Sequence, residues 1–183
     1  RWDKGAPWSS SGIEGVSRWL HRVWGIVIQL TSGETGVDAP DSSERDLRRK
    51  VHQTIQQVTH DMENFEFNTV ISALMELTNA LNAAGKAGLA GSEVYTEGVE
   101  TLLKLMAPVT PHISEELWEQ LAADGAGRET PLITANWPQL DEALIDRAAA
   151  AEMRWVIGLV QGVRSVRSEM NVPAAARMPL MLL

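Results

Sequence analysis

Apolar residues recur at intervals of three and four along nearly the whole of this sequence. One stretch shows the pattern clearly, because Leu47, Val51, Ile55, Val58 and Met62 follow one another at intervals of four, four, three and four. Such spacing places apolar side chains on one face of an α-helix, where they can pack against a common core. Five or six amphipathic helices joined by short loops account for most of the chain, which predicts an all-α antiparallel helix bundle.

The expected helices are separated by segments rich in glycine, proline, serine and aspartate. We expect helices over residues 13–30, from about 43 to 62, 70–81, 92–106, 111–121 and 141–170. One of Ser9 to Ser11 is expected to cap the first helix, and Thr110 to cap the fifth with Pro111 at its first position. Asp141 is expected to open the last helix.

Two of these helices carry well-defined apolar stripes. The stripe of the first helix is expected to consist of Ile13, Val16, Leu20, Val23, Trp24 and Val27. The seam of the last helix is expected to consist of Val156, Leu159, Val160, Val163, Val166 and Met170. Both stripes are expected to face the core.

The chain has 183 residues, which is the size of a single domain. We expect one helical domain over residues 13–172, preceded by a linker over 1–12 and followed by the start of a further segment over 173–183. The RMPLMLL stretch at the end of that segment predicts a strand. Because the sequence opens with Arg1 and lacks the pattern of a signal peptide, an excised fragment is the favoured interpretation.

The composition restricts the classes of function. A net charge of -8 gives no overall positive field, so contacts with nucleic acid would depend on local basic patches. The sequence contains no cysteine, which excludes disulfides and thiolate sites and fits a cytoplasmic protein. No apolar stretch approaches the roughly 20 residues needed to span a bilayer, so no membrane association is expected.

The residues give no sign of catalysis or of a bound metal. Surface or capping positions are expected for His21, His52, His60 and His112, because no two of them have the spacing of zinc ligands. No glycine-rich phosphate loop and no nucleophile elbow occurs. We therefore expect no catalytic residue, no metal site and no cofactor in this chain.

The strongest functional signal is a cluster of cations in the first turns of the second expected helix. Arg45, Arg48 and Arg49 lie on one side of that helix at intervals of three and four, beside Lys50 and His52. A ridge of this kind can follow a phosphate backbone. The alternative interpretation is a solvated face, on which the arginines pair with acidic residues of the same and neighbouring helices.

A second, weaker group of cations lies on the last helix. It consists of Arg164 and Arg167, with Arg177 beyond the helix. The alternative to a binding surface is a solvated stripe on the side of the helix opposite the apolar seam. Tryptophans could stack on nucleotide bases, but at helical spacing they are more often part of a core. The tryptophans concerned are Trp19, Trp24, Trp118, Trp137 and Trp155.

Three stretches of the sequence resemble leucyl-tRNA synthetases, a family of class I aminoacyl-tRNA synthetases. GAPWSSSGIEGVSRWLHRVW resembles the passage from their catalytic core into a helical domain, and RRKVHQTIQQVTHDMENFEFNTVISALMELTNAL resembles the second and third helices of that domain. LLKLMAPVTPHISEELWEQL, followed by TANWPQLDEALI, resembles its later helices. The final stretch, VQGVRSVRSEMNVPAAARMPLMLL, is closer to valyl-tRNA synthetases.

This resemblance implies a helix bundle of the anticodon-binding type found in class I synthetases. It also implies an enzyme that uses ATP and magnesium to join leucine to tRNA(Leu), with catalytic and editing domains elsewhere in the same polypeptide. The HIGH-like and KMSKS-like motifs of the family do not occur here, so this chain is expected to bind tRNA and not to catalyse. The residues implied to contact tRNA phosphates and sugars are Arg18, Arg22, Arg48, Arg49, Lys50 and His52.

Two alternatives to a leucyl fragment stay open. The same domain of a valyl or isoleucyl enzyme is favoured by the ending of the chain. A helical module that docks protein partners through an apolar groove is favoured by the net acidity. Salt discriminates the second alternative, because affinity for tRNA falls steeply as salt rises whereas apolar docking barely responds.

Overall fold

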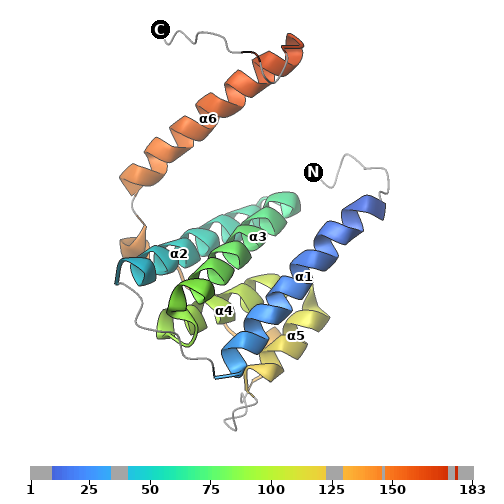
Figure 1. The fold of residues 1–183 in the computed structure, drawn as a ribbon, viewed down its shortest axis with the longest axis vertical. Helices are drawn as coiled ribbons and strands as arrows, with labels where there is room; N and C mark the ends of the chain where they lie inside the picture. Colours follow the sequence, from blue (N-terminus) through green and yellow to red (C-terminus); the bar gives the residue numbers. More distant parts are fainter. Residues whose placement is uncertain (1–9, 34–40, 123–129, 146, 173–175, 177–183) are drawn as a thin grey trace. The chain divides into compact units, whose positions relative to one another are not determined.

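A computed structural model describes residues 10–33, 41–122, 130–145, 147–172 and 176. The chain divides into two compact units, Arg1–Leu144 and Ile145–Leu183. All regular structure in the described residues is helical, which confirms the predicted all-α fold (Figure 1). The predicted strand falls on residues 177–183, which lie outside the described residues.

Five α-helices form the first unit as far as it is described. They are α1 (Ser10–Thr31), α2 (Asp41–Glu63), α3 (Phe67–Ala84), α4 (Glu93–Met106) and α5 (Pro111–Gln120). Short helical turns follow α3 and α5, namely η2 (Gly85–Leu89), η3 (Leu132–Thr134) and η4 (Glu142–Leu144). A tight break turns the chain back between α2 and α3, so these two helices lie antiparallel (Figure 1). Helix α3 packs against α1, α2 and α4, and α5 packs against α1 and α4.

The core of this unit is built mainly from leucine and valine side chains of α2, α3 and α4. The largest fully buried side chains are Trp19, Tyr95, Leu74, Leu77, Leu81, Leu89, Leu102, Leu103, Leu105, Met106, Leu117 and Val23. Trp19 ties α1 to α3, because its indole N–H donates a hydrogen bond of 2.9 Å to the buried Thr78 hydroxyl. Burial of the indole therefore leaves no polar atom of that side chain unsatisfied.

The buried face of α1 differs from the predicted stripe. The side chains that face the core are Trp19, Val23, Ile26 and Val27. The prediction was wrong for Ile13, Val16 and Trp24, which are 40–49% exposed. Apolar residues cover more than half of the circumference of this helix, and α3, α4 and α5 pack against only part of it.

The helix ends agree with the predictions only in part. Helix α1 begins at Ser10, so its cap position falls on Ser9, outside the described residues. Pro111 stands in the first turn of α5 as predicted. Thr110 does not cap α5 through its side chain, because its hydroxyl donates instead to the Met106 carbonyl at 3.2 Å.

The last long helix begins later than predicted. The Asp141 carboxylate accepts a hydrogen bond of 2.9 Å from the Ala143 amide and opens only the short turn η4. Helix α6 (Arg147–Glu169) belongs to the second unit. Its predicted seam includes side chains that are exposed, from Val156 at 38% to Met170 at 73%. The boundaries of the predicted domain, 13–172, stay a prediction.

Candidate nucleic-acid interface

Ion pairs engage most of the cations at the start of α2. Lys50 Nζ lies 2.7 Å from a Glu76 carboxylate oxygen and joins α2 to α3. Arg48 Nε lies 3.6 Å from a Glu97 oxygen and joins α2 to α4. Arg49 pairs with Asp46, one turn away in α2, at 3.1 Å. Arg48 and Arg49 thus form ion pairs of the kind that a solvated face would have, and a contact of either with tRNA stays a prediction.

His52 is buried, so the expectation of a surface or capping histidine is wrong at this position. Its Nδ1 accepts a hydrogen bond of 3.1 Å from the Asp141 amide, and its Nε2 lies 3.6 Å from a Glu97 oxygen. Because the donating amide requires an unprotonated Nδ1, the neutral ring carries its proton on Nε2, toward Glu97. His52 therefore holds α2, α4 and the segment at Asp141 together instead of offering a group to solvent.

Helix α1 presents two arginines whose charges are available to a ligand. Arg18 forms only an exposed pair with Glu14 at 3.8 Å, in which both side chains are more than 70% exposed. Such a pair contributes little and is readily exchanged for another anion. Arg22, one turn further along, is exposed and forms no ion pair within the described residues. Together Arg18 and Arg22 form a basic ridge along α1.

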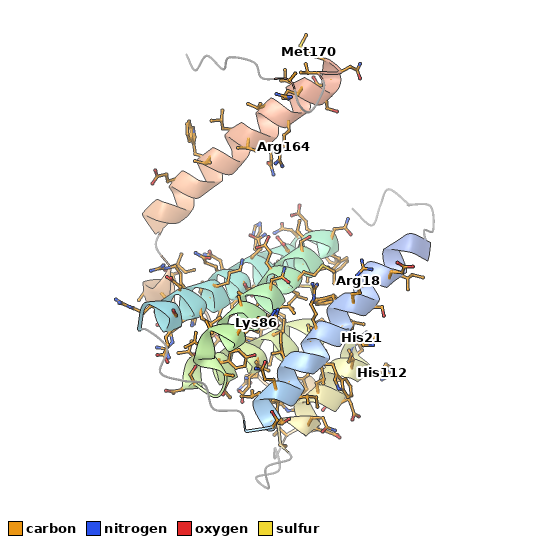
Figure 2. The ribbon with its side chains drawn as sticks, viewed as in Figure 1. Arg18, His21, Lys86, His112, Arg164 and Met170 are labelled. Carbon is orange, nitrogen blue, oxygen red and sulfur yellow. The ribbon has the colours of Figure 1, made fainter. Side chains whose placement is uncertain are left out.

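Two histidines and one further arginine add to the exposed polar surface of the first unit. His21 is exposed on α1, and its Nδ1 lies 2.8 Å from the Ser17 carbonyl, so Nδ1–H is the donor (Figure 2). His112 is exposed at the beginning of α5 (Figure 2). Arg45 is exposed at the start of α2 and, like Arg22, forms no ion pair among the described residues.

The cations of α6 belong to the second unit. Arg164 is exposed and Arg167 is partly buried, one turn apart on the helix. Arg177 lies outside the described residues. A role of Arg164 and Arg167 in binding stays a prediction.

Three of the five tryptophans that the structure describes belong to the packed interior of the first unit. Trp118 is buried and Trp137 is partly buried; their indole N–H groups donate to the Thr130 carbonyl at 3.2 Å and to the Thr59 hydroxyl at 2.9 Å. Together with Trp19 they confirm the interpretation as packing residues. Trp24 and Trp155 are 40% and 63% exposed and keep accessible ring surface.

An apolar groove of about 910 Å³ lies beside the basic ridge, at a place that the sequence analysis did not indicate. It is lined by the exposed side of α1 and by one residue of α5, namely Gly12, Ile13, Val16, Ser17, Leu20, His21, Trp24 and Ile113. The width of the apolar stripe on α1 was the available signal. A stripe that exceeds what a bundle can cover leaves an apolar surface outside it.

The described residues also bear on two other classes of function. None of their helices is both long and apolar enough to cross a membrane. In the same part of the chain, no three histidine, aspartate or glutamate side chains converge as metal ligands would.

Comparison with known proteins identifies the family. Residues 44–182 match the anticodon-binding domain of tRNA ligase. The leucine–tRNA ligase of Synechococcus elongatus is 42% identical over 175 residues, which are 95% of this chain and 19% of that protein. The leucine–tRNA ligase of Dehalococcoides mccartyi is 38% identical over 173 residues, which are 94% of this chain and 20% of that protein.

A solved structure is similar as well. The ternary complex of Agrobacterium radiobacter agnB2 LeuRS with tRNA and LeuAMS contains a region that matches with a TM-score of 0.62 at 31% identity. The match covers 77% of this chain and 18% of that one. The chain spans about a fifth of the length of the curated relatives it matches. Because the family match extends from the first turns of α2 beyond α6, the chain belongs to the anticodon-binding domains of tRNA ligases.

Proposed function

We propose that this chain is the tRNA-binding module of a leucine–tRNA ligase and that it holds tRNA(Leu) while leucine is attached at a catalytic site outside the chain. The relatives named above are leucine–tRNA ligases, which favours the leucyl identity over the valyl and isoleucyl alternatives. In this proposal ATP and magnesium act at the distant catalytic site, in the cytoplasm. Catalytic and editing domains of the same polypeptide would then be further partners.

The basic ridge of α1 carries this proposal. Arg18 and Arg22 are exposed on one face of a helix, one turn apart, and only a weak exposed pair competes for Arg18. Lys50 and Arg48 instead join α2 to its neighbours through ion pairs, and His52 is buried. Phosphate contacts are therefore assigned first to Arg18 and Arg22, with Arg45 as an additional exposed cation.

These contacts would orient the tRNA without reading its sequence. An arginine guanidinium binds phosphate oxygens through a planar pair of donors, and such contacts carry no base information. Each contact also releases condensed counterions, which makes binding depend on salt. The module would supply grip and orientation, and the choice of tRNA would depend on other contacts.

A charge reversal on the ridge tests the proposal. We expect Arg22→Glu to weaken tRNA binding by about tenfold and to lower the salt slope of log Kd by about one unit. Lys86→Glu is the matched control, because it makes the same charge change at an exposed cation that lies outside the ridge (Figure 2). Filter retention measures the affinity of each variant for tRNA. If both variants weakened tRNA binding equally, the ridge would act only through the overall charge of the chain and not through specific contacts.

A protein-docking function is the second candidate, and the apolar groove beside α1 favours it. In that case tRNA would bind weakly or without dependence on salt. The same titrations separate the two candidates, since apolar docking barely responds to the salt concentration.

A further inference from the structure

A second groove lies on another part of the first unit, between α5 and the segment 131–137. Its volume is about 860 Å³, which is within the range of sites that accept ligands. Its walls include three prolines, Pro108, Pro111 and Pro131, together with Ile133 and Trp137.

Hydrogen bonds fix the segment that forms one wall of this groove. The Glu115 carboxylate accepts a hydrogen bond from the Leu132 amide at 2.8 Å and another from the Ile133 amide at 3.2 Å. The Trp118 indole binds the backbone at Thr130, and Leu132 is buried. At the other end, the Trp137 indole is held by Thr59 of α2. The groove is therefore preformed, which lowers the entropy lost when a ligand binds.

The wall nevertheless exposes an apolar side chain that adds nothing to the core. Ile133 is 83% exposed, the most exposed of the large apolar residues described. Its backbone is anchored through Glu115, so its side chain is held at the edge of the groove. A fixed and exposed isoleucine beside a preformed groove is a feature of surfaces that bind partners.

The charged residues that line the groove, Lys104, His112, Glu115, Glu116 and Glu119, favour a cation over a phosphate. Glu116 and Glu119 are exposed on its α5 side, and neither forms an ion pair within the described residues. The lysine that also lines it, Lys104, places its Nζ 5.4 Å from the centre of the Trp118 ring. Phosphates would be repelled by these carboxylates, whereas lysine or arginine side chains would be attracted.

We propose that this groove binds an extended peptide segment of a partner protein, in which an apolar side chain stands next to lysine or arginine. The apolar side chain packs against Ile133 and the prolines, and the cation pairs with Glu116 or Glu119. A volume of about 860 Å³ has room for a few side chains of an extended segment. Neither Arg18 nor Arg22 of the basic ridge lines this groove.

Three labelled nine-residue peptides test the proposal by fluorescence anisotropy with the whole chain. The first repeats Lys-Leu-Ser, the second replaces each lysine by glutamate, and the third replaces each leucine by glycine. We expect the first peptide to bind at least tenfold more tightly than either of the others. Excess tRNA is expected to leave this binding unchanged.

Two variants locate the binding, and a third is their control. Ile133→Ser and Glu119→Lys are each expected to weaken binding of the first peptide by at least fivefold, and both positions are exposed, so the fold is preserved. Glu63→Lys makes the same charge change as Glu119→Lys at an exposed position of α2 outside the groove and is expected to change binding less than twofold. Absence of binding, equal binding of all three peptides, displacement by tRNA, or equal effects of the two lysine variants would each overturn the proposal.

Discussion

Tyr95 shows at the scale of one residue how a buried polar group affects the bundle. Its side chain is fully buried in α4, and its hydroxyl has no hydrogen-bond partner within the described residues. Burial raises the pKa of Tyr95 above its usual value of 10.0, because desolvation disfavours the phenolate. A hydroxyl that loses its contact with water and gains no partner lowers the stability of the fold.

Removal of this hydroxyl is predicted to stabilise the protein. We expect Tyr95→Phe to raise the free energy of unfolding by about 1 kcal/mol, because the desolvation cost disappears while the ring still fills its space. The folded pKa is the higher one, so the neutral form is retained on folding and stability falls as the pH rises above 10. Urea denaturation at pH 7 and pH 10.5 measures both effects.

The alkaline loss of stability should be smaller in the phenylalanine variant than in the parent chain. Tyr95 is the only tyrosine in the sequence, so tyrosinate absorbance reports this residue alone. A variant that is less stable at pH 7 would instead mean that the hydroxyl is satisfied in solution.

The sequence predicted the exposure of some candidate site residues but not of others, because tertiary contacts decide which side chains are buried. Arg18 and Arg22 were implied by resemblance and are indeed exposed on α1. His52 was implied in the same way, but its position four residues from the half-buried Arg48 gives no hint of a partner that is distant in sequence. The Asp141 amide and the Glu97 carboxylate decide its environment, and neither contact is encoded in a helical period.

At the scale of the helices, periodicity was sufficient to find the elements but not to orient all of them. The described parts of α2 to α5 fall close to the predicted ranges, because each has one apolar face bounded by turn residues. Helix α1 is apolar on more than one side, so its period does not say which side faces the core. Asp141 has the sequence of a helix start, yet it opens only a single turn.

The crossing of α4 with α2 and α3 depends on the missing side chain of Gly98. A Cβ at this position would lie 2.8 Å from Leu81 Cδ2 and 3.3 Å from Val51 Cγ2. A Cβ built on Gly25 in α1 would meet no neighbouring atom within 4 Å. Alanine substitutions at the two glycines therefore distinguish the gain from helix propensity, present at both, from the cost of overpacking, present only at Gly98.

Alanine is predicted to have different effects at these two glycines. Gly25→Ala should stabilise the chain by up to about 1 kcal/mol, through helix propensity alone. Gly98→Ala gains the same propensity but forces the core to shift, at a cost of about 1–3 kcal/mol. We expect Gly98→Ala to be at least about 1 kcal/mol less stable than Gly25→Ala in urea denaturation. Equal stability of the two variants would show that the close packing at Gly98 is absent.

At the scale of the whole molecule, the chain consists of two units and its connected core lies in the first. The buried cluster extends from Trp19 to Leu132, and each of its members belongs to the unit Arg1–Leu144. The members of this cluster lie in α1 to α5, η2 and η3. The expectation of one helical domain over residues 13–172 stays a prediction.

Shortening of the chain tests this division. A chain that ends at Leu144 is predicted to unfold in one cooperative transition, with a midpoint within about 5 °C of the parent, since a 1 kcal/mol change shifts Tm by about 2–8 °C in chains of this size. Far-UV circular dichroism and calorimetry measure the transition. Loss of cooperativity in the shortened chain would show that residues 145–183 are needed for the core.

Charge is the other property of the whole molecule that matters for function. The chain is acidic overall, with a net charge of -8. Positive charge is therefore confined to small parts of its surface, such as the basic ridge. The basic ridge of α1 and the acidic groove at α5 are distinct surfaces, suited to ligands of opposite charge. Tight tRNA binding by this chain therefore requires phosphate contacts at the ridge that outweigh the overall repulsion.

The most direct test is the affinity of the chain for a leucine tRNA transcript at about 50 mM and about 200 mM salt. With the two or three phosphate contacts expected from Arg18, Arg22 and Arg45, the slope of about -0.9 per contact predicts an affinity roughly ten- to fortyfold lower at the higher salt. An affinity that stays the same between the two salt concentrations would contradict the binding of tRNA through its phosphates.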